Sequence, residues 1–128
     1  MITVGIGVDI VKNKRIKLLI KNKKFINRIY CFREIQNSKK FLDKTNYFAK
    51  RFAAKESLAK AIGSGFSDGI NFKDIEISND KLGKPFYQIN KKIKNFIFKR
   101  MKLTDFNLFL SISDEKEYSV AFTIIQKK

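Results

Sequence analysis

The spacing of hydrophobic and polar positions predicts a strand followed by helices in the first part of the chain. Residues 2–10 alternate apolar with small or polar side chains, which is typical of a strand. Residues 13–30 have helical spacing with a break near Asn22, whereas residues 32–38 favour neither structure. The chain therefore begins with a strand that leads into a helical region.

A long helix is predicted within residues 39–62, and the pattern leaves its start open around Asn46. Gly63-Ser64-Gly65 ends this helix, because glycine readily takes the left-handed conformation that closes many helices. A Walker-type phosphate loop is excluded here, since such loops precede a helix and use its positive N-terminal end.

The second half of the chain returns to strands. The pattern predicts an alternating segment at residues 70–78 with an irregularity near Lys73, a turn at 79–83, a strand at 85–90, a basic amphipathic helix at 91–102, and strands at 106–113 and 118–126. Charged residues join the last two strands, which indicates an antiparallel hairpin. Mixed strands and helices in 128 residues predict one α+β domain, residues 1–128.

Two charged residues of the long helix are candidates for chemistry. Glu56 and Lys60 are four residues apart, so they project from the same side of the helix. They lie beside a mostly apolar stripe that consists of Phe48, Phe52, Lys55, Ala59 and Ile62. At this boundary of the core they could hold a metal ion and a phosphate. The alternative is an ordinary surface ion pair.

Asp9 interrupts the apolar part of the first strand near its end. It could be a ligand, or it could cap the following helix, which is a common role of aspartate. Gly5 and Gly7 precede it, and glycine in a strand often marks the close approach of another backbone or of a ligand. The Gly-x-Gly-x-Asp pattern is therefore compatible with a binding site.

The composition excludes several kinds of active site. The chain has no histidine and one cysteine, which removes Ser-His-Asp and Cys-His systems and a thiolate zinc site. The remaining oxygen ligands favour hard cations such as Mg²⁺. Cys31 is expected to be a small buried side chain, and a single cysteine fits a reducing cytoplasm. We expect no signal peptide and no membrane span.

The formal charge of +16 favours acidic partners. A basic cluster in the first helical region, which includes Arg15, could dock an acidic protein or bind phosphates, or it could be a solvated face. Charge and aromatic content also leave open a small nucleic-acid-binding protein or a non-catalytic assembly subunit. Two further features have both an ordinary structural interpretation and a functional one. Lys84 is either a turn lysine or a phosphate contact, and the hydroxyls of Ser111 and Ser113 face either solvent or a ligand.

Four motifs, taken in order, resemble those of the holo-acyl-carrier-protein synthases, which are short phosphopantetheinyl transferases. They are Gly5-Ile6-Gly7-Val8-Asp9, the helix residues Phe52, Lys55, Glu56, Lys60 and Ala61, the turn Gly83-Lys84-Pro85, and the strand Leu110-Ser111-Ile112-Ser113. Each motif is weak alone, but the ordered set is specific and covers essentially the whole chain. The chain departs from many members at Asp114, where they have histidine.

The resemblance implies an antiparallel sheet packed against a long helix, and transfer of 4′-phosphopantetheine from coenzyme A to a serine of apo-acyl carrier protein, in support of fatty acid biosynthesis. Adenosine 3′,5′-bisphosphate is the other product. It also implies a homotrimer with active sites between neighbouring subunits and no role in nucleic-acid binding.

The resemblance further implies roles for particular residues. Asp9 and Glu56 are expected to bind Mg²⁺, with Glu56 as the base and Lys60 stabilising or protonating the departing phosphate. Coenzyme A is expected to contact Arg51, Lys60, Lys84 and Ser111. The acidic carrier protein is expected to contact Arg15.

Overall fold

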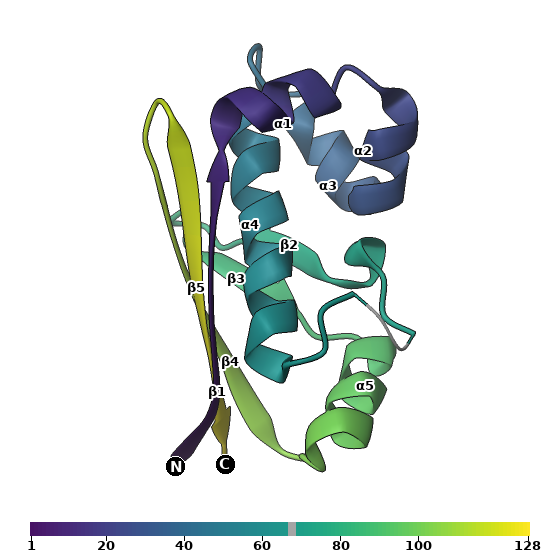
Figure 1. Ribbon diagram of the computed structural model, residues 1–128, viewed down its shortest axis with the longest axis vertical. Coiled ribbons are helices and arrows are strands. Elements are labelled where there is room, and N and C mark those ends of the chain that lie inside the picture. The colour runs from purple at the N-terminus through teal and green to yellow at the C-terminus, as the bar shows by residue number, and fades with distance from the viewer. Residues whose placement is uncertain (67–68) are drawn as a thin grey trace.

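The computed structural model describes residues 1–66 and 69–128 (Figure 1). Its elements in chain order are β1 (Ile2–Lys12), α1 (Asn13–Leu19), α2 (Lys23–Ile29), α3 (Phe32–Ser38), α4 (Thr45–Ile62), a 3-10 turn (Phe72–Asp74), β2 (Glu76–Asn79), β3 (Pro85–Gln88), α5 (Lys91–Met101), β4 (Phe106–Asp114) and β5 (Tyr118–Lys127). The predicted α+β class is confirmed.

The strands form two antiparallel sheets, and both pack against the long helix. One sheet has the order β1-β5-β4, and β2 and β3 form the other. Helix α4 packs along β1 and β5, while α1, α2 and α3 gather at one end of α4 and α5 lies near the other (Figure 1). None of the helices in the described ranges combines the length and the apolar character that crossing a membrane requires.

Local hydrogen bonds explain where the helices begin and end. The predicted break near Asn22 is confirmed, since its side chain accepts from the Lys24 amide at 2.9 Å and caps α2. Residues 32–38, which favoured neither structure, form α3. Helix α4 begins at Thr45, next to Asn46, because Asp43 accepts from the Thr45 amide at 2.9 Å; residues 39–44 lie outside it. Gly63 ends α4 with φ 87°, as predicted.

The second half shows similar agreement. The irregularity near Lys73 is the 3-10 turn, which shortens the predicted strand of residues 70–78 to β2. Strand β3 ends at Gln88, and the side chain of Asn90 accepts from the Ile93 amide at 2.9 Å to cap α5. The closing hairpin pairs Asp114 with Ser119 beside the turn.

The two glycines of β1 allow the helix to approach the sheet closely. A Cβ atom at Gly7 would overlap the carbonyl oxygen of Ser57, and one at Gly5 would overlap that of Ala61. The close approach anticipated from the Gly-x-Gly pattern is therefore that of the α4 backbone. Because of it, the residues that follow Gly7 in β1 lie directly against α4.

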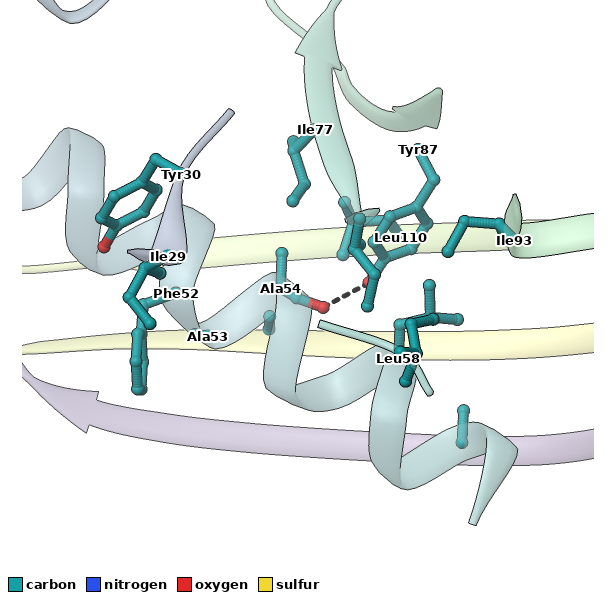
Figure 2. Close-up of a cluster of buried hydrophobic side chains, with 14 of the residues drawn as sticks. Ile29, Tyr30, Phe52, Ala53, Ala54, Leu58, Ile77, Tyr87, Ile93 and Leu110 are labelled. Atoms are coloured by element: carbon teal, nitrogen blue, oxygen red, sulfur yellow. Dashed lines mark hydrogen bonds between the residues drawn. The ribbon is translucent and has the colours of Figure 1, made fainter. Parts of the chain in front are cut away.

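Helix α4 is surrounded by core on most of its circumference. Figure 2 shows Ala54 and Leu58 of α4 among Ile77, Tyr87 and Leu110 from three strands. The Tyr87 hydroxyl donates to the Ala54 carbonyl oxygen at 2.6 Å, so its polar tip is satisfied inside the apolar cluster. Small side chains on α4 let the strands approach and hold the helix on both sides.

A fully buried ion pair joins α4 to α3. The ammonium of Lys55 lies 2.7 Å from Oε1 of Glu34, and their side chains are 0% and 1% exposed. Lys55 also donates to the carbonyl oxygens of Phe72 and Ile75, while Glu34 accepts from the backbone amides of Cys31 and Ile77. Burial lowers the pKa of Lys55, and Glu34 opposes that shift. The expected apolar stripe of α4 thus contains a charge that tertiary contacts satisfy.

Replacing Glu34 with glutamine should reduce the free energy of unfolding by about 3–5 kcal/mol, because it leaves the buried ammonium without its counter-charge. Urea denaturation at fixed protein concentration measures the loss. Arg33→Gln is the matched control: it removes a 3.1 Å ion pair with Glu76 from the neighbouring residue, but the Arg33 side chain is 69% exposed. The control should cost less than about 1 kcal/mol. Equal losses in both variants would contradict the structural role of the buried pair.

Candidate active site

Asp9 and Lys60 meet where the end of β1 lies against α4. The Lys60 ammonium lies 3.0 Å from Oδ1 of Asp9 and donates to the Val8 carbonyl oxygen at 3.2 Å. The Asp9 side chain is 14% exposed and that of Lys60 is 52% exposed. The carboxylate is therefore held in place by packing, while the amine remains accessible.

Glu56 lies one helical turn before Lys60 and shares its surroundings with Asp9. Burial raises the pKa of the Glu56 carboxyl and nearby Asp9 raises it further, whereas Lys60 and Arg15 oppose the rise. Two acids that are distant in sequence thus lie close enough to repel each other. The structure brings Asp9 of β1 together with Glu56 and Lys60, the pair that the sequence placed on one side of the long helix.

The acids of this cluster suit a hard divalent cation. Their mutual repulsion would be relieved by a cation that binds both of them. Among residues 1–66 and 69–128 no group of three or more histidine, cysteine, aspartate or glutamate side chains is placed to hold a metal. Two carboxylates fit Mg²⁺, which usually binds one or two protein acids and completes its shell with water and phosphate oxygens.

Arg15 extends from α1 toward the same region. Its guanidinium carbon lies 5.9 Å from the ring centre of Phe52, one turn before Glu56 on α4. The arginine is exposed and its charge reaches Glu56. It therefore lies at the rim of the acid cluster, on the basic helix where the family resemblance implies docking of the carrier protein.

Ser111 lies on the other face of the sheet. It pairs with Phe122, which pairs with Val8, and residues opposite one another in antiparallel strands face the same side. Val8 and Asp9 are consecutive in β1, so they face opposite sides. The hydroxyl of Ser111 is therefore separated from the Asp9 of its own chain by the sheet.

A shallow hollow of about 330 Å³ lies beside the closing hairpin. It is lined by Ile10, Ser113, Asp114, Glu115, Tyr118 and Val120. Asp114 accepts a hydrogen bond from the Asn46 side chain at 2.8 Å. Asp114, where the family resemblance led us to expect histidine, is thus tied to the start of α4.

Arg51 and Lys84 lie near the turn between β2 and β3. Arg51 is buried, stacks on Tyr47 at 3.8 Å and donates to Oδ1 of Asn79 at 2.6 Å. The Asn79 side chain in turn donates to the Gly83 carbonyl oxygen at 3.0 Å, beside exposed Lys84. Arg51 therefore already contacts the turn through Asn79, and its expected contact with coenzyme A stays a prediction.

Cys31 corrects one expectation from the sequence. It is partly exposed instead of fully buried, because it precedes α3 at the surface end of that helix. Burial nevertheless raises the pKa of its thiol, so an activated nucleophile is disfavoured, as expected.

Sequence reasoning missed two residues that organise the site. Glu34, the partner of Lys55, falls in the segment that favoured neither helix nor strand. Asn79 was seen only as part of a turn. A charged residue at a core position of α4 was a signal that a buried partner must exist, but nothing local indicated which residue it was.

Comparison with known proteins places the chain in a family. Residues 5–123 match the family model of the 4′-phosphopantetheinyl transferase superfamily. A holo-[acyl-carrier-protein] synthase of Pelagibacter ubique is 56% identical over 124 residues, covering 97% of each chain. One from Wolbachia pipientis is 47% identical and covers 94% of this chain and 95% of the relative.

Solved structures agree. The holo-[acyl-carrier-protein] synthase of Neisseria meningitidis superposes with a TM-score of 0.87 at 36% identity, covering 98% of this chain and 100% of the other. That of Bacillus anthracis, in complex with CoA (3′,5′-ADP), gives 0.84 at 34% identity and covers both chains fully. Since the family match spans both the strand with Asp9 and the helix with Glu56 and Lys60, the chain belongs to the 4′-phosphopantetheinyl transferase superfamily.

Proposed function

We propose that this protein transfers 4′-phosphopantetheine from coenzyme A to a serine of apo-acyl carrier protein. The observation that carries the proposal is the convergence of Asp9, Glu56 and Lys60 in a chain of this superfamily. Relatives that match nearly the whole chain are holo-[acyl-carrier-protein] synthases, and one solved relative is a complex with CoA (3′,5′-ADP). The products are holo-acyl carrier protein and adenosine 3′,5′-bisphosphate, and the reaction supports fatty acid biosynthesis in the cytoplasm.

In this proposal Asp9 and Glu56 hold Mg²⁺. When bound, the cation supplies positive charge that offsets the negative charge of the pyrophosphate. The two carboxylates come from a strand and a helix that the β1 glycines hold in contact, so their separation is kept by packing. The remaining positions of the ion are left to water and substrate oxygens.

Glu56 is the candidate base and Lys60 the candidate stabiliser of the leaving group. The serine oxygen forms a bond to the phosphorus that carries the pantetheine arm, and the bond from that phosphorus to the oxygen of adenosine 3′,5′-bisphosphate breaks. Glu56 receives the serine proton directly or through water, and burial raises the pKa of Glu56 toward the range useful for a base. The accessible ammonium of Lys60 stabilises or protonates the departing phosphate.

Isosteric replacement of either acid tests this assignment. Asp9→Asn and Glu56→Gln should each lower kcat/KM for transfer by about 100-fold or more while the fold is kept. Intact-mass measurement of the apo-carrier protein after incubation with coenzyme A and Mg²⁺ reports the product. Asp105→Asn, an equivalent change at an acid of the loop before β4, serves as the control and should retain wild-type turnover. Wild-type turnover in both site variants would remove the pair from the mechanism.

Carrier protein recognition is assigned to α1. The carrier protein is acidic, and Arg15 is exposed at the rim of the acid cluster, so a docked carrier would bring its serine near Glu56. The charge of +16 attracts acidic partners over a range that salt shortens to about 8 Å at physiological ionic strength.

Reversing the charge of Arg15 should affect the two substrates differently. Arg15→Glu is expected to raise KM for the carrier protein about tenfold and KM for coenzyme A much less. The KM for the carrier protein should also depend less on salt than it does in the wild-type protein. Steady-state kinetics with each substrate varied in turn gives both values. Lys94→Glu, which makes the same change on exposed α5, should leave both unchanged. Equal increases in both KM values for Arg15→Glu would argue against docking there.

A homotrimer with shared active sites is the assembly we infer. The outer face of the β1-β5-β4 sheet exposes apolar side chains, including Ile6 at 60%, Val8 at 53% and Phe122 at 40%. A contiguous apolar face of this kind favours burial against another surface. Ser111 lies on that face. A neighbouring subunit packed there would bring its Asp9, Glu56 and Lys60 toward a second group, which consists of Ser111 and of Lys84 just before β3. Arg51 supports this second group through Asn79 and Gly83.

Mixing two inactive variants tests the shared site. Asp9→Asn damages the group formed by Asp9, Glu56 and Lys60. The double variant Lys84→Ala/Ser111→Ala damages the group that the neighbouring subunit would contribute. After the two chains are unfolded and refolded together in equal amounts, about a quarter of the interfaces should combine two intact groups and restore that share of transfer activity. Refolding each variant alone is the control. No recovery in mixed oligomers would place the complete site within a single chain.

A further inference from the structure

The ion pair between Lys60 and Asp9 has a consequence for metal binding. The ammonium occupies Oδ1 of Asp9 at 3.0 Å and is anchored a second time by the Val8 carbonyl oxygen at 3.2 Å. Asp9 is also a proposed metal ligand, and its side chain is only 14% exposed. With so little open surface, a carboxylate that keeps this ammonium on Oδ1 has fewer acceptor sites left for a hydrated divalent ion.

The charges around the pair point in the same direction. Asp9 and Glu56 repel one another, and Lys60 and Arg15 are the cations that offset the repulsion. Of these two, Lys60 is the one bonded directly to Asp9. It supplies positive charge to the acids while no metal does so.

Resting on the function proposed above, we propose that Lys60 stands in the place of the divalent cation and exchanges with it. Binding of the cation to Asp9 and Glu56 releases the ammonium, which then turns to the phosphates of coenzyme A. The side chain suits this movement, because it is 52% exposed and carries its charge on a flexible four-carbon stem. Metal binding and phosphate binding are thereby coupled through one side chain.

Chemical labelling of lysines measures the exchange directly. Trace acetic anhydride acylates amines, and an amine held between a carboxylate and a carbonyl oxygen reacts more slowly than one that is free in water. Titration of the wild-type chain with MgCl₂, followed by peptide mass spectrometry, should show acylation of Lys60 increasing about fivefold. Subsequent addition of adenosine 3′,5′-bisphosphate, which has no thiol to consume the reagent, should protect Lys60 again.

The chain contains a matched internal control. Lys92 lies 2.9 Å from Asp74, with side chains 54% and 18% exposed, so this ion pair closely resembles that of Lys60 and Asp9. Its labelling should not respond to Mg²⁺, because the proposed metal site lies at Asp9 and Glu56 and does not include Asp74. An equal rise at both lysines would reflect general salt screening and would overturn the exchange.

Affinity measurements provide a second test. By calorimetry without coenzyme A, Lys60→Gln should bind Mg²⁺ about fivefold more tightly than the wild-type protein, because the competing ammonium is gone. Arg15→Gln removes a cation near Glu56 that does not bond to Asp9, and it should tighten binding by no more than about twofold. Equal gains in the two variants, or a loss in Lys60→Gln, would overturn the exchange.

Different results would overturn the Lys60 exchange and the Mg²⁺ site itself. Mg²⁺ binding that leaves the labelling of Lys60 unchanged would overturn the exchange and leave the metal site intact. Absence of Mg²⁺ binding with and without coenzyme A would overturn the proposed metal site and the exchange with it.

Discussion

An ammonium enclosed in a protein interior must be surrounded by oxygen atoms, and this requirement organises the centre of the molecule. Lys55 donates to the carboxylate of Glu34 in α3. It also donates to two backbone carbonyl oxygens, one in the 3-10 turn and one at the residue that follows this turn. Glu34 also accepts from the amide of Ile77 in β2. These hydrogen bonds help to fix the orientation of three segments against α4, because hydrogen bonds are directional whereas apolar burial is not.

The buried charge also explains how one helix serves both the core and the candidate site. Successive residues of a helix point about 100° apart, so the side chain after Lys55 leaves the core at its edge. That residue is Glu56, which is half-buried beside Asp9. A helix with two packed sides has little freedom to rotate, and the position of Glu56 relative to β1 follows from packing around Lys55 and from contact at Gly7.

The candidate site is divided between two regions of the sheet. Asp9, Glu56 and Lys60 lie at edge strand β1, on the face that α4 covers, whereas Ser111 lies on β4 at the opposite edge and on the opposite face. Within one chain the sheet separates these groups. The exposed apolar side chains of the outer face give a reason for the two regions to meet between chains, because the same association would bury Val8 and Phe122. Catalysis and assembly would then depend on the same surface.

Much of the local structure could be predicted from the sequence. The strand with Asp9, the break at Asn22, the helix that ends at Gly63 and the final hairpin all follow from periodicity and capping, which depend on neighbouring residues. The i,i+4 spacing of Glu56 and Lys60 likewise placed them on one side of a helix. The α3 segment could not be recognised, since its pattern is short and its main anchor is Glu34, whose partner lies 21 residues away.

The sequence by itself singled out Asp9, Glu56 and Lys60 as candidates for the chemistry, because they stand in the ordered motifs and the absence of histidine limits the alternatives. Only the tertiary structure decided that Lys60 pairs with Asp9 instead of Glu56, that Arg51 is engaged with Asn79, and that Ser111 faces away from the acids of its own chain. The physical reason is that the pairing of a charge depends on distance and burial between segments far apart in the chain. Local periodicity contains no information on either.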